Sequence, residues 1–156
     1  MNFDSISLLV KRLQYIRSPW AVVGGSNLFI RGICDQATDV DIVTSESGVI
    51  EIKNALPIFN SGTLPLERTK CEKVSSIFFT TEVDNCIVEV MGAPHNYIGG
   101  KWVPNIDWEA SIEFCSINNG LVVPLTSLEY EMKINMTLGN SARTKIIKRY
   151  LTRAPR

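Results

Sequence analysis

Residues 20–44, WAVVGGSNLFIRGICDQATDVDIVT, decide the fold that this sequence predicts. A short apolar run, AVV, indicates a buried strand, and Gly24, Gly25 and Ser26 follow it directly. The glycines allow a sharp turn and the close approach of another group to backbone N–H donors. Ser26 is a favourable N-cap residue, so we expect a helix to start there with its positive end facing the turn. A turn of this kind suits phosphate.

The same stretch returns as DVDIV, residues 39–43, which alternates carboxylates with apolar residues. Side chains two apart on a strand share a face, so Asp39 and Asp41 point the same way, ~6.5 Å apart along the strand. Two carboxylates on one face repel each other unless a cation lies between them. Mg²⁺ favours such oxygen ligands together with substrate phosphates. The stretch therefore predicts a phosphate-binding turn close to a two-carboxylate metal site.

This combination resembles the nucleotidyltransferase superfamily, which has a polymerase-beta-like fold. The signature of that superfamily is a Gly-Gly or Gly-Ser turn on a short helix, followed by Asp-x-Asp on the next strand. Gly24, Gly25, Ser26, Asp39 and Asp41 match it here. The resemblance implies an α+β (α/β) fold, in which a mixed sheet is flanked by helices and C-terminal helices follow.

A third carboxylate lies in CIVEVM, residues 86–91, an apolar segment that pairs in the prediction with residues 76–81 as a hairpin. Glu89 is the acidic residue in this segment, and burying it without a partner would be costly. The superfamily places its third acidic residue on a strand of this kind, so the resemblance implies that Glu89 joins Asp39 and Asp41 at the metals. The superfamily more often has Asp at this position.

The remaining elements follow from periodicity and turn residues. Helices are predicted at 4–16, 47–56, 126–138 and 141–151, and strands at 111–117 and 121–123, with Pro124 ending the last strand. The strand at 86–91 is expected to end at Gly92, before a loop over 92–100 that holds His95. A single histidine without a nearby Cys or Asp partner is an unfavourable candidate for a metal ligand or catalytic base.

The C-terminal part extends the resemblance to small bacterial and archaeal nucleotidyltransferase-like proteins. These carry Val-Pro at a strand end, a helix that begins near Leu-Glu and holds a lysine, and Arg-x-Lys-Asp at the start of the next helix. Lys133 and Arg143 match the two cations, and the resemblance implies that they reach nucleotide phosphates. Ile146 stands where the family often has Asp, so a role for that acidic position is not carried over. Alternatively, both cations are ordinary surface residues.

The length and composition of the chain limit the class of protein, the number of domains and the location that the sequence predicts. The chain has 156 residues and 45% apolar residues, which argues against disorder and favours one domain, with a core over about 20–124 and C-terminal helices over about 126–151. No apolar run approaches the ~20 residues that span a bilayer, and no basic-then-apolar leader begins the chain, so a cytoplasmic location is expected. The formal net charge is zero, but no acidic residue follows Glu131 while seven cations do. Four scattered cysteines show no zinc-site spacing.

The function implied by the resemblance is transfer of a nucleoside monophosphate from a nucleoside triphosphate to a hydroxyl, with release of pyrophosphate. Asp39, Asp41 and Glu89 would hold two Mg²⁺ ions, with Mn²⁺ as an alternative, and Glu89 would accept the hydroxyl proton. Gly24, Gly25 and Ser26 would bind the phosphates. The acceptor stays open between an RNA end, a protein side chain and a small molecule such as an aminoglycoside, and so does the oligomeric state. Two alternatives remain: a non-catalytic nucleotide-binding or toxin–antitoxin-type module on the same fold, and a structural domain.

Overall fold

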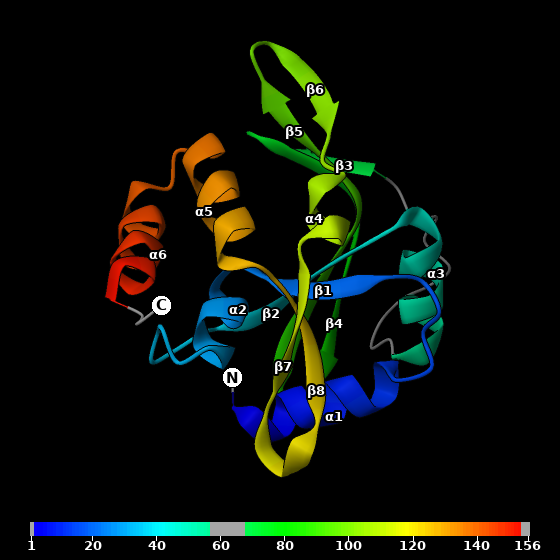
Figure 1. The fold of residues 1–156 in the computed structure, drawn as a ribbon. Helices are drawn as coiled ribbons and strands as arrows, with labels where there is room; N and C mark the ends of the chain where they lie inside the picture. Colours follow the sequence, from blue (N-terminus) through cyan, green and yellow to red (C-terminus); the bar gives the residue numbers. More distant parts are fainter. Residues whose placement is uncertain (1, 57–67, 154–156) are drawn as a thin grey trace.

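The computed structural model describes residues 2–56 and 68–153, and Figure 1 shows a mixed sheet with helices on both faces. In chain order the main elements are α1 (Phe3–Leu13), β1 (Trp20–Val23), α2 (Gly24–Ile30), β2 (Asp39–Thr44), α3 (Glu46–Ala55), β3 (Arg68–Cys71), β4 (Val74–Val83), β5 (Cys86–Ile98), β6 (Lys101–Pro104), α4 (Asp107–Ala110), β7 (Ile112–Ser116), β8 (Val122–Thr126), α5 (Leu128–Thr137) and α6 (Ser141–Arg153). A 3₁₀ turn, Asn118–Gly120, joins β7 to β8.

The strands form one eight-stranded sheet in the order β3-β4-β5-β2-β1-β8-β7, with β6 paired to the outer part of β5. β2 runs parallel to β5 and β1 runs parallel to β8, while the other pairs are antiparallel. This confirms the prediction of a mixed sheet flanked by helices, with two C-terminal helices. The strand that carries Asp39 and Asp41 is thereby placed beside the strand that carries Glu89.

One face of the sheet is covered by α1 and α3 and holds the main apolar core. Even-numbered residues of β2 and β5, such as Val40, Ile42 and Val88, are fully buried there. They pack with Leu9 of α1 and Ile52 of α3. Because side chains alternate along a strand, burial of the even-numbered residues directs the odd-numbered ones to the opposite face.

The opposite face carries α2, α5 and α6 (Figure 1). A smaller apolar cluster there joins the sheet to α5 through Val43 and Tyr130. A third cluster, Leu28, Leu128 and Ile147, holds α2, α5 and α6 together. The two C-terminal helices are thus fixed over the face to which Asp39, Asp41 and Glu89 point.

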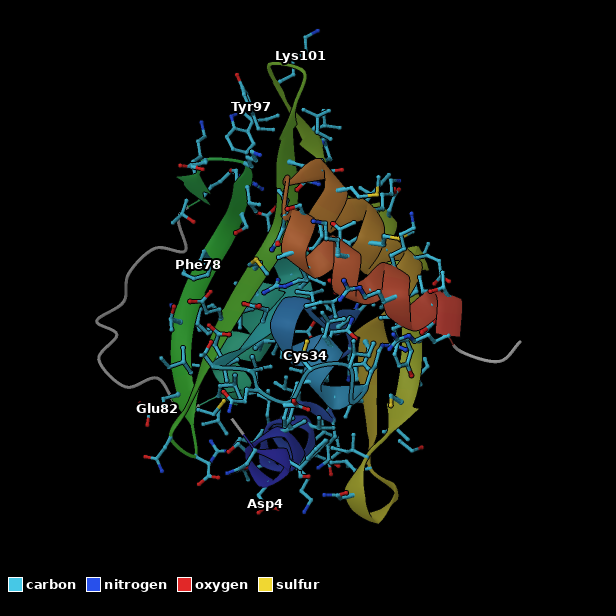
Figure 2. All side chains as sticks on the ribbon, turned by 90° about the vertical axis from the view of Figure 1, so that its left-hand side faces the viewer. Asp4, Cys34, Phe78, Glu82, Tyr97 and Lys101 are labelled. Carbon is cyan, nitrogen blue, oxygen red and sulfur yellow. The ribbon has the colours of Figure 1, made fainter. Side chains whose placement is uncertain are left out.

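Strand β5 does not end at Gly92 as predicted, but continues to Ile98. The glycine is there for packing, because a Cβ at Gly92 would lie 1.9 Å from Cγ2 of Val49 on α3. His95 therefore lies in a strand and not in a loop, and its Nδ1 is 2.8 Å from Nη1 of Arg68. Figure 2 shows β5 and β6 projecting as an arm, with Tyr97 and Lys101 near its tip.

Pro124 does not end its strand either, because β8 continues through it to Thr126. The pairing with β1 joins Val22 to Leu125, so the contact with β1 requires no N–H at position 124. The other predicted strands and helices form with shifted ends, by one or two residues in most cases. Within residues 2–56 and 68–153, no helix is both long and apolar enough to cross a membrane.

Candidate active site

Three carboxylates meet on the sheet face that lies under the C-terminal helices. Asp39 and Asp41 alternate with the buried Val40 and Ile42 on β2, so both point away from the main core. Asp41 is in register with Glu89 on the neighbouring strand β5. Neighbouring strands lie about 4.8 Å apart, so these two side chains leave the sheet side by side. The structure therefore brings together the acidic residues that the sequence singled out.

The electrostatic environment of Asp41 disfavours its charged form. Burial raises the pKa of Asp41 to about 7, and the negative charges of Asp39 and Glu89 add to this rise, while Arg143 opposes it. A cation near Asp41 would relieve that repulsion. The donor set therefore fits a hard divalent cation such as Mg²⁺, which takes one or two carboxylates and completes its shell with water and substrate phosphates. Among the described residues, no three His, Cys, Asp or Glu side chains form a ready-made metal cage.

The glycine turn lies directly against Asp41. Gly24 has a φ of +68°, and a Cβ placed there would be 2.7 Å from Oδ2 of Asp41. Only glycine adopts this conformation readily, and only glycine leaves the carboxylate in place. Gly25 follows with a conventional φ and more space.

Helix α2 begins at Gly24 and not at Ser26, so the predicted N-cap is wrong. The physical reason is that a distant side chain satisfies the first donor of the turn: the N–H of Gly24 donates to Oε1 of Glu131 at 2.9 Å. Ser26 is fully buried, and its hydroxyl donates to the carbonyl of Val23 and accepts from the N–H of Asp41. In this arrangement Ser26 fixes the turn to β2, and its fully buried hydroxyl has both of its partners within the backbone.

The two predicted cations are placed differently. Arg143 on α6 reaches over the turn, where its guanidinium nitrogens lie 3.5 Å from the Cβ positions built on Gly24 and Gly25. Lys133 on α5 instead forms an ion pair with Asp107 of α4, at 2.5 Å, and both side chains are exposed. Arg143 therefore lies beside the glycine turn, while the amine of Lys133 is paired with Asp107.

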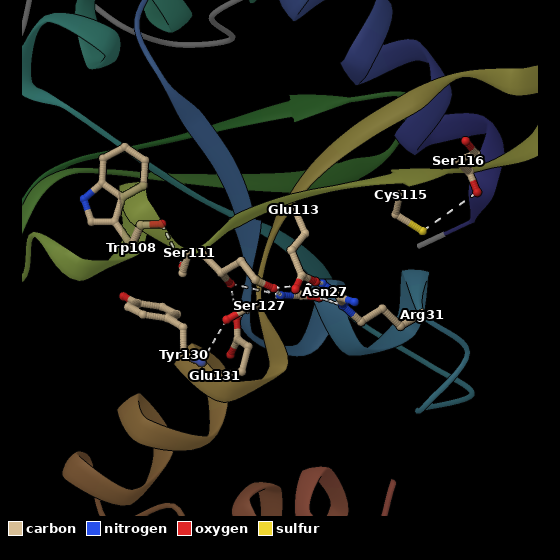
Figure 3. Close-up of polar contacts among 11 residues, drawn as sticks. Asn27, Arg31, Trp108, Ser111, Glu113, Cys115, Ser116, Ser127, Tyr130 and Glu131 are labelled. Atoms are coloured by element: carbon tan, nitrogen blue, oxygen red, sulfur yellow. Dashed lines mark hydrogen bonds and ion pairs between the residues drawn. The ribbon is translucent and has the colours of Figure 1, made fainter. Parts of the chain in front are cut away.

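Sequence reasoning missed Glu131, although it is the most buried acidic residue near the site. Its Oε1 accepts hydrogen bonds from Gly24 N (2.9 Å), Asn27 Nδ2 (3.1 Å) and Thr126 Oγ1 (2.7 Å). Burial raises its pKa, and these three donors oppose the rise. Figure 3 shows Glu131 beneath Asn27 and Ser127 at the junction of α2 and α5. The available signal was its spacing from Leu128, which predicts that Glu131 lies on the inward face of the helix.

A cleft opens beside these groups, between the sheet and α5, and encloses about 210 Å³. Its lining includes Gly24, Asp41, Glu131 and Arg143. The remainder is lined by apolar side chains and amides, among them Val43, Met91, Ile134, Leu138, Asn96, Asn105 and Asn135. The site thus combines a carboxylate cluster, a glycine turn with a cation above it, and a partly apolar cleft.

Comparison with known proteins shows the fold to which this arrangement belongs. No protein-family model matches the chain, and no curated protein sequence matches it. Among solved structures, a candidate nucleotidyltransferase from Thermotoga maritima is 25% identical, with a TM-score of 0.78, and the alignment covers 97% of this chain and 93% of that one.

Two antibiotic-modifying proteins are more distant in sequence. ANT(2'')-Ia, in complex with adenylyl-2''-tobramycin, is 10% identical with a TM-score of 0.55, and the alignment covers 96% of this chain and 90% of that one. The lincosamide antibiotic adenylyltransferase LnuA, bound to lincomycin, is 8% identical with a TM-score of 0.56, and the coverage is 95% and 97%. At these identities the likeness concerns the fold alone. The chain has the polymerase-beta-like nucleotidyltransferase fold.

Proposed function

We propose that this chain is a metal-dependent nucleotidyltransferase that transfers a nucleoside monophosphate from a nucleoside triphosphate to a hydroxyl acceptor. The observation that carries the proposal is the meeting of Asp39, Asp41 and Glu89 beside a glycine turn that lies under Arg143. Such an arrangement suits a reaction in which charge builds up on phosphate oxygens. Two similarly folded proteins, a candidate nucleotidyltransferase and a lincosamide antibiotic adenylyltransferase, support the same reaction class.

In this proposal the carboxylates hold two Mg²⁺ ions, or Mn²⁺ ions in their place. When bound, the cations neutralise phosphate charge and lower the pKa of the acceptor hydroxyl. Glu89 lies one strand away from Asp41 and accepts the hydroxyl proton as the acceptor oxygen bonds to the α-phosphorus. The bond from that phosphorus to the pyrophosphate breaks, and pyrophosphate leaves.

The phosphates are held by the turn and by α6. The N–H of Gly25 and the guanidinium of Arg143 are the donors for the β- and γ-phosphates, because Glu131 already occupies the N–H of Gly24. Bidentate donation from a guanidinium suits phosphate oxygens. Lys133 contributes only if its ion pair with Asp107 opens.

A turnover assay tests the proposal. The protein is incubated with Mg²⁺ and each α-labelled nucleoside triphosphate, in the presence of RNA, cellular protein, tobramycin or lincomycin as acceptor. Similarly folded proteins bind lincomycin and the adenylylated form of tobramycin. We expect labelled product and pyrophosphate with one acceptor class. The Asp39→Asn/Asp41→Asn double variant should show none, while Asp35→Asn, an exposed carboxylate nearby, should retain full turnover.

Calorimetric binding of the same nucleoside triphosphates, measured beside turnover, separates the alternative function. Metal-dependent binding of a nucleoside triphosphate without turnover on any acceptor would favour the non-catalytic nucleotide-binding or interaction module. Equal turnover by wild type and the double variant would remove the metal role of Asp39 and Asp41.

A further inference from the structure

The second carboxylate oxygen of Glu131, Oε2, takes no part in the hydrogen bonds by which Glu131 joins α5 to α2. All three donors, from Gly24, Asn27 and Thr126, bind Oε1. No described residue hydrogen-bonds to Oε2. Glu131 is only 1% exposed, so water can reach this carboxylate over very little surface. A buried carboxylate oxygen without a partner is costly.

The position of Glu131 shows where a partner for Oε2 can come from. Among the described residues, Oγ of Ser75 is the side-chain polar atom that has neither a hydrogen-bond partner nor appreciable solvent-accessible surface. Oε2 of Glu131 also has no partner, so this atom keeps some accessible surface. Glu131 lines the cleft beside Asp41, which is the open space from which Oε2 can be reached. A ligand in this cleft can donate a hydrogen bond to Oε2, and this bond discriminates strongly because Glu131 is buried.

The rest of the cleft defines the chemistry of such a ligand. Beyond Asp41 its walls are Val43, Met91, Ile134 and Leu138, with amides but no second cation among the described lining residues. Apolar walls with a few placed polar groups suit a ring. A volume of about 210 Å³ is below the roughly 300–1,000 Å³ of sites for drug-sized ligands, so one or two rings fit and a folded macromolecule does not.

We propose that this cleft binds an uncharged, ring-bearing part of a substrate, which donates an O–H or N–H hydrogen bond to Oε2 of Glu131. Glu131 is then a specificity-determining residue as well as a structural one. The inference rests on the proposed function for its location beside the phosphate-binding turn. Two sources share this chemistry: the nucleoside of the triphosphate, and a small hydroxylated acceptor.

Binding measurements with two kinds of probe distinguish the sources. The ring probes are adenosine, guanosine, cytidine, uridine and a panel of neutral methyl glycosides. Tripolyphosphate with Mg²⁺ is the probe without a ring. We expect one ring class to bind wild type, and Ile134→Phe, which fills the cleft, to weaken that binding at least about tenfold. Met136→Phe makes a comparable change on an exposed position of the same helix and should leave it unaltered.

The variant Glu131→Gln tests the role of Oε2 specifically. The glutamine oxygen can still accept from Gly24, Asn27 and Thr126, but the cleft then meets an N–H donor instead of an acceptor. We expect ring-probe affinity to fall about tenfold or more, while the midpoint of thermal unfolding moves by less than about 2 °C. Tripolyphosphate affinity should stay the same or rise, because a negative charge is removed.

Three outcomes overturn the inference. One is that no ring probe binds, and a second is that Ile134→Phe leaves ring binding within twofold of wild type. The third is that Glu131→Gln lowers ring and tripolyphosphate affinity equally along with thermal stability, because that pattern reports a purely structural role. Tripolyphosphate binding alone would leave the proposed function standing. Ring binding without tripolyphosphate binding would keep the cleft and contradict the phosphate-binding role of the glycine turn and Arg143 in the proposed function.

Discussion

Two separate features require glycine at position 24: a positive φ and the close approach of Asp41. Gly32 shares only the positive φ, so variants at the two positions measure the two features separately. Gly24 and Gly32 have nearly the same backbone conformation, with φ of +68° and +69°. A Cβ at Gly32 meets nothing within 4 Å, whereas one at Gly24 lies 2.7 Å from Oδ2 of Asp41. Both alanine variants therefore have the same strain, and only one of them displaces the carboxylate.

We predict that Gly32→Ala lowers the free energy of unfolding by about 1 kcal/mol without changing Mg²⁺-dependent nucleotide binding. Gly24→Ala should destabilise the fold further and weaken that binding at least about tenfold. Chemical denaturation and calorimetry of the two variants measure both effects. Equal nucleotide affinity in the two variants would show that Asp41 does not depend on the close approach of the turn.

The ionisation of Asp41 predicts an unusual dependence of stability on pH. Its pKa of about 7 in the folded protein lies above the ordinary 3.8, because burial and neighbouring carboxylates disfavour the charge. At low pH the group is protonated in both states. As pH rises from about 4 through 7 the unfolded chain loses this proton first, so this group's contribution to stability falls.

Without metal, Asp41→Asn should therefore raise the free energy of unfolding at pH 8, on the order of a few kcal/mol, and should have little effect near pH 4. Thermal unfolding in a chelator at both pH values measures this change, with Asp35→Asn as the exposed control. Excess Mg²⁺ should reduce the difference in the free energy of unfolding between the variant and wild type, because it stabilises wild type alone. A destabilised Asp41→Asn variant at pH 8 would show that the pKa of Asp41 is not raised in the folded protein.

At the scale of elements, Glu131 joins α5 to the turn of α2 and to β8. Replacing it with alanine leaves three donors without their acceptor. We predict that Glu131→Ala lowers the free energy of unfolding by about 3 kcal/mol, measured by denaturant titration. Glu129→Ala, on the exposed face of the same helix, should change it by less than about 0.5 kcal/mol. Similar losses in both variants would mean that the three hydrogen bonds contribute little.

The local sequence pattern predicts most of the helices and strands. The prediction fails where a contact with another element determines the structure. Alternation along the strand predicts that Asp39 and Asp41 share a face, because strand periodicity is a local property. The resemblance alone implies that Glu89 joins them, because its position beside Asp41 depends on the pairing of β2 with β5. The prediction of a strand end at Gly92 is wrong because the glycine is required by its contact with Val49, which comes from α3. These errors concern packing between elements, which sequence spacing does not encode.

The same limit applied to the polar residues of the site. Ser26 was expected to cap its helix, but the first donor of that helix is taken by Glu131, 107 residues away. Lys133 and Arg143 were equivalent as cations in the sequence. Only the packing of α5 and α6 shows that Lys133 pairs with Asp107 while Arg143 reaches the turn.

Across the whole molecule, the C-terminal helix completes a site that begins at residue 24. The buried Ile147 holds α6 against α2 and α5, so Arg143 is fixed above the glycine turn. We predict that Arg143→Ala weakens tripolyphosphate binding about tenfold or more, measured by calorimetry with Mg²⁺. Arg149→Ala removes an exposed charge from the same helix and should have less than a twofold effect. Equal losses would point to a diffuse effect of the basic helix.

In the proposed function the carboxylate face binds a nucleoside triphosphate together with a divalent cation. Calorimetric titration of the four nucleoside triphosphates, with and without Mg²⁺, into wild type and the Asp39→Asn/Asp41→Asn variant measures this binding. We expect binding that requires Mg²⁺ in wild type and is lost in the double variant. Binding that is equal in the two proteins, or no binding of any triphosphate, would contradict this expectation.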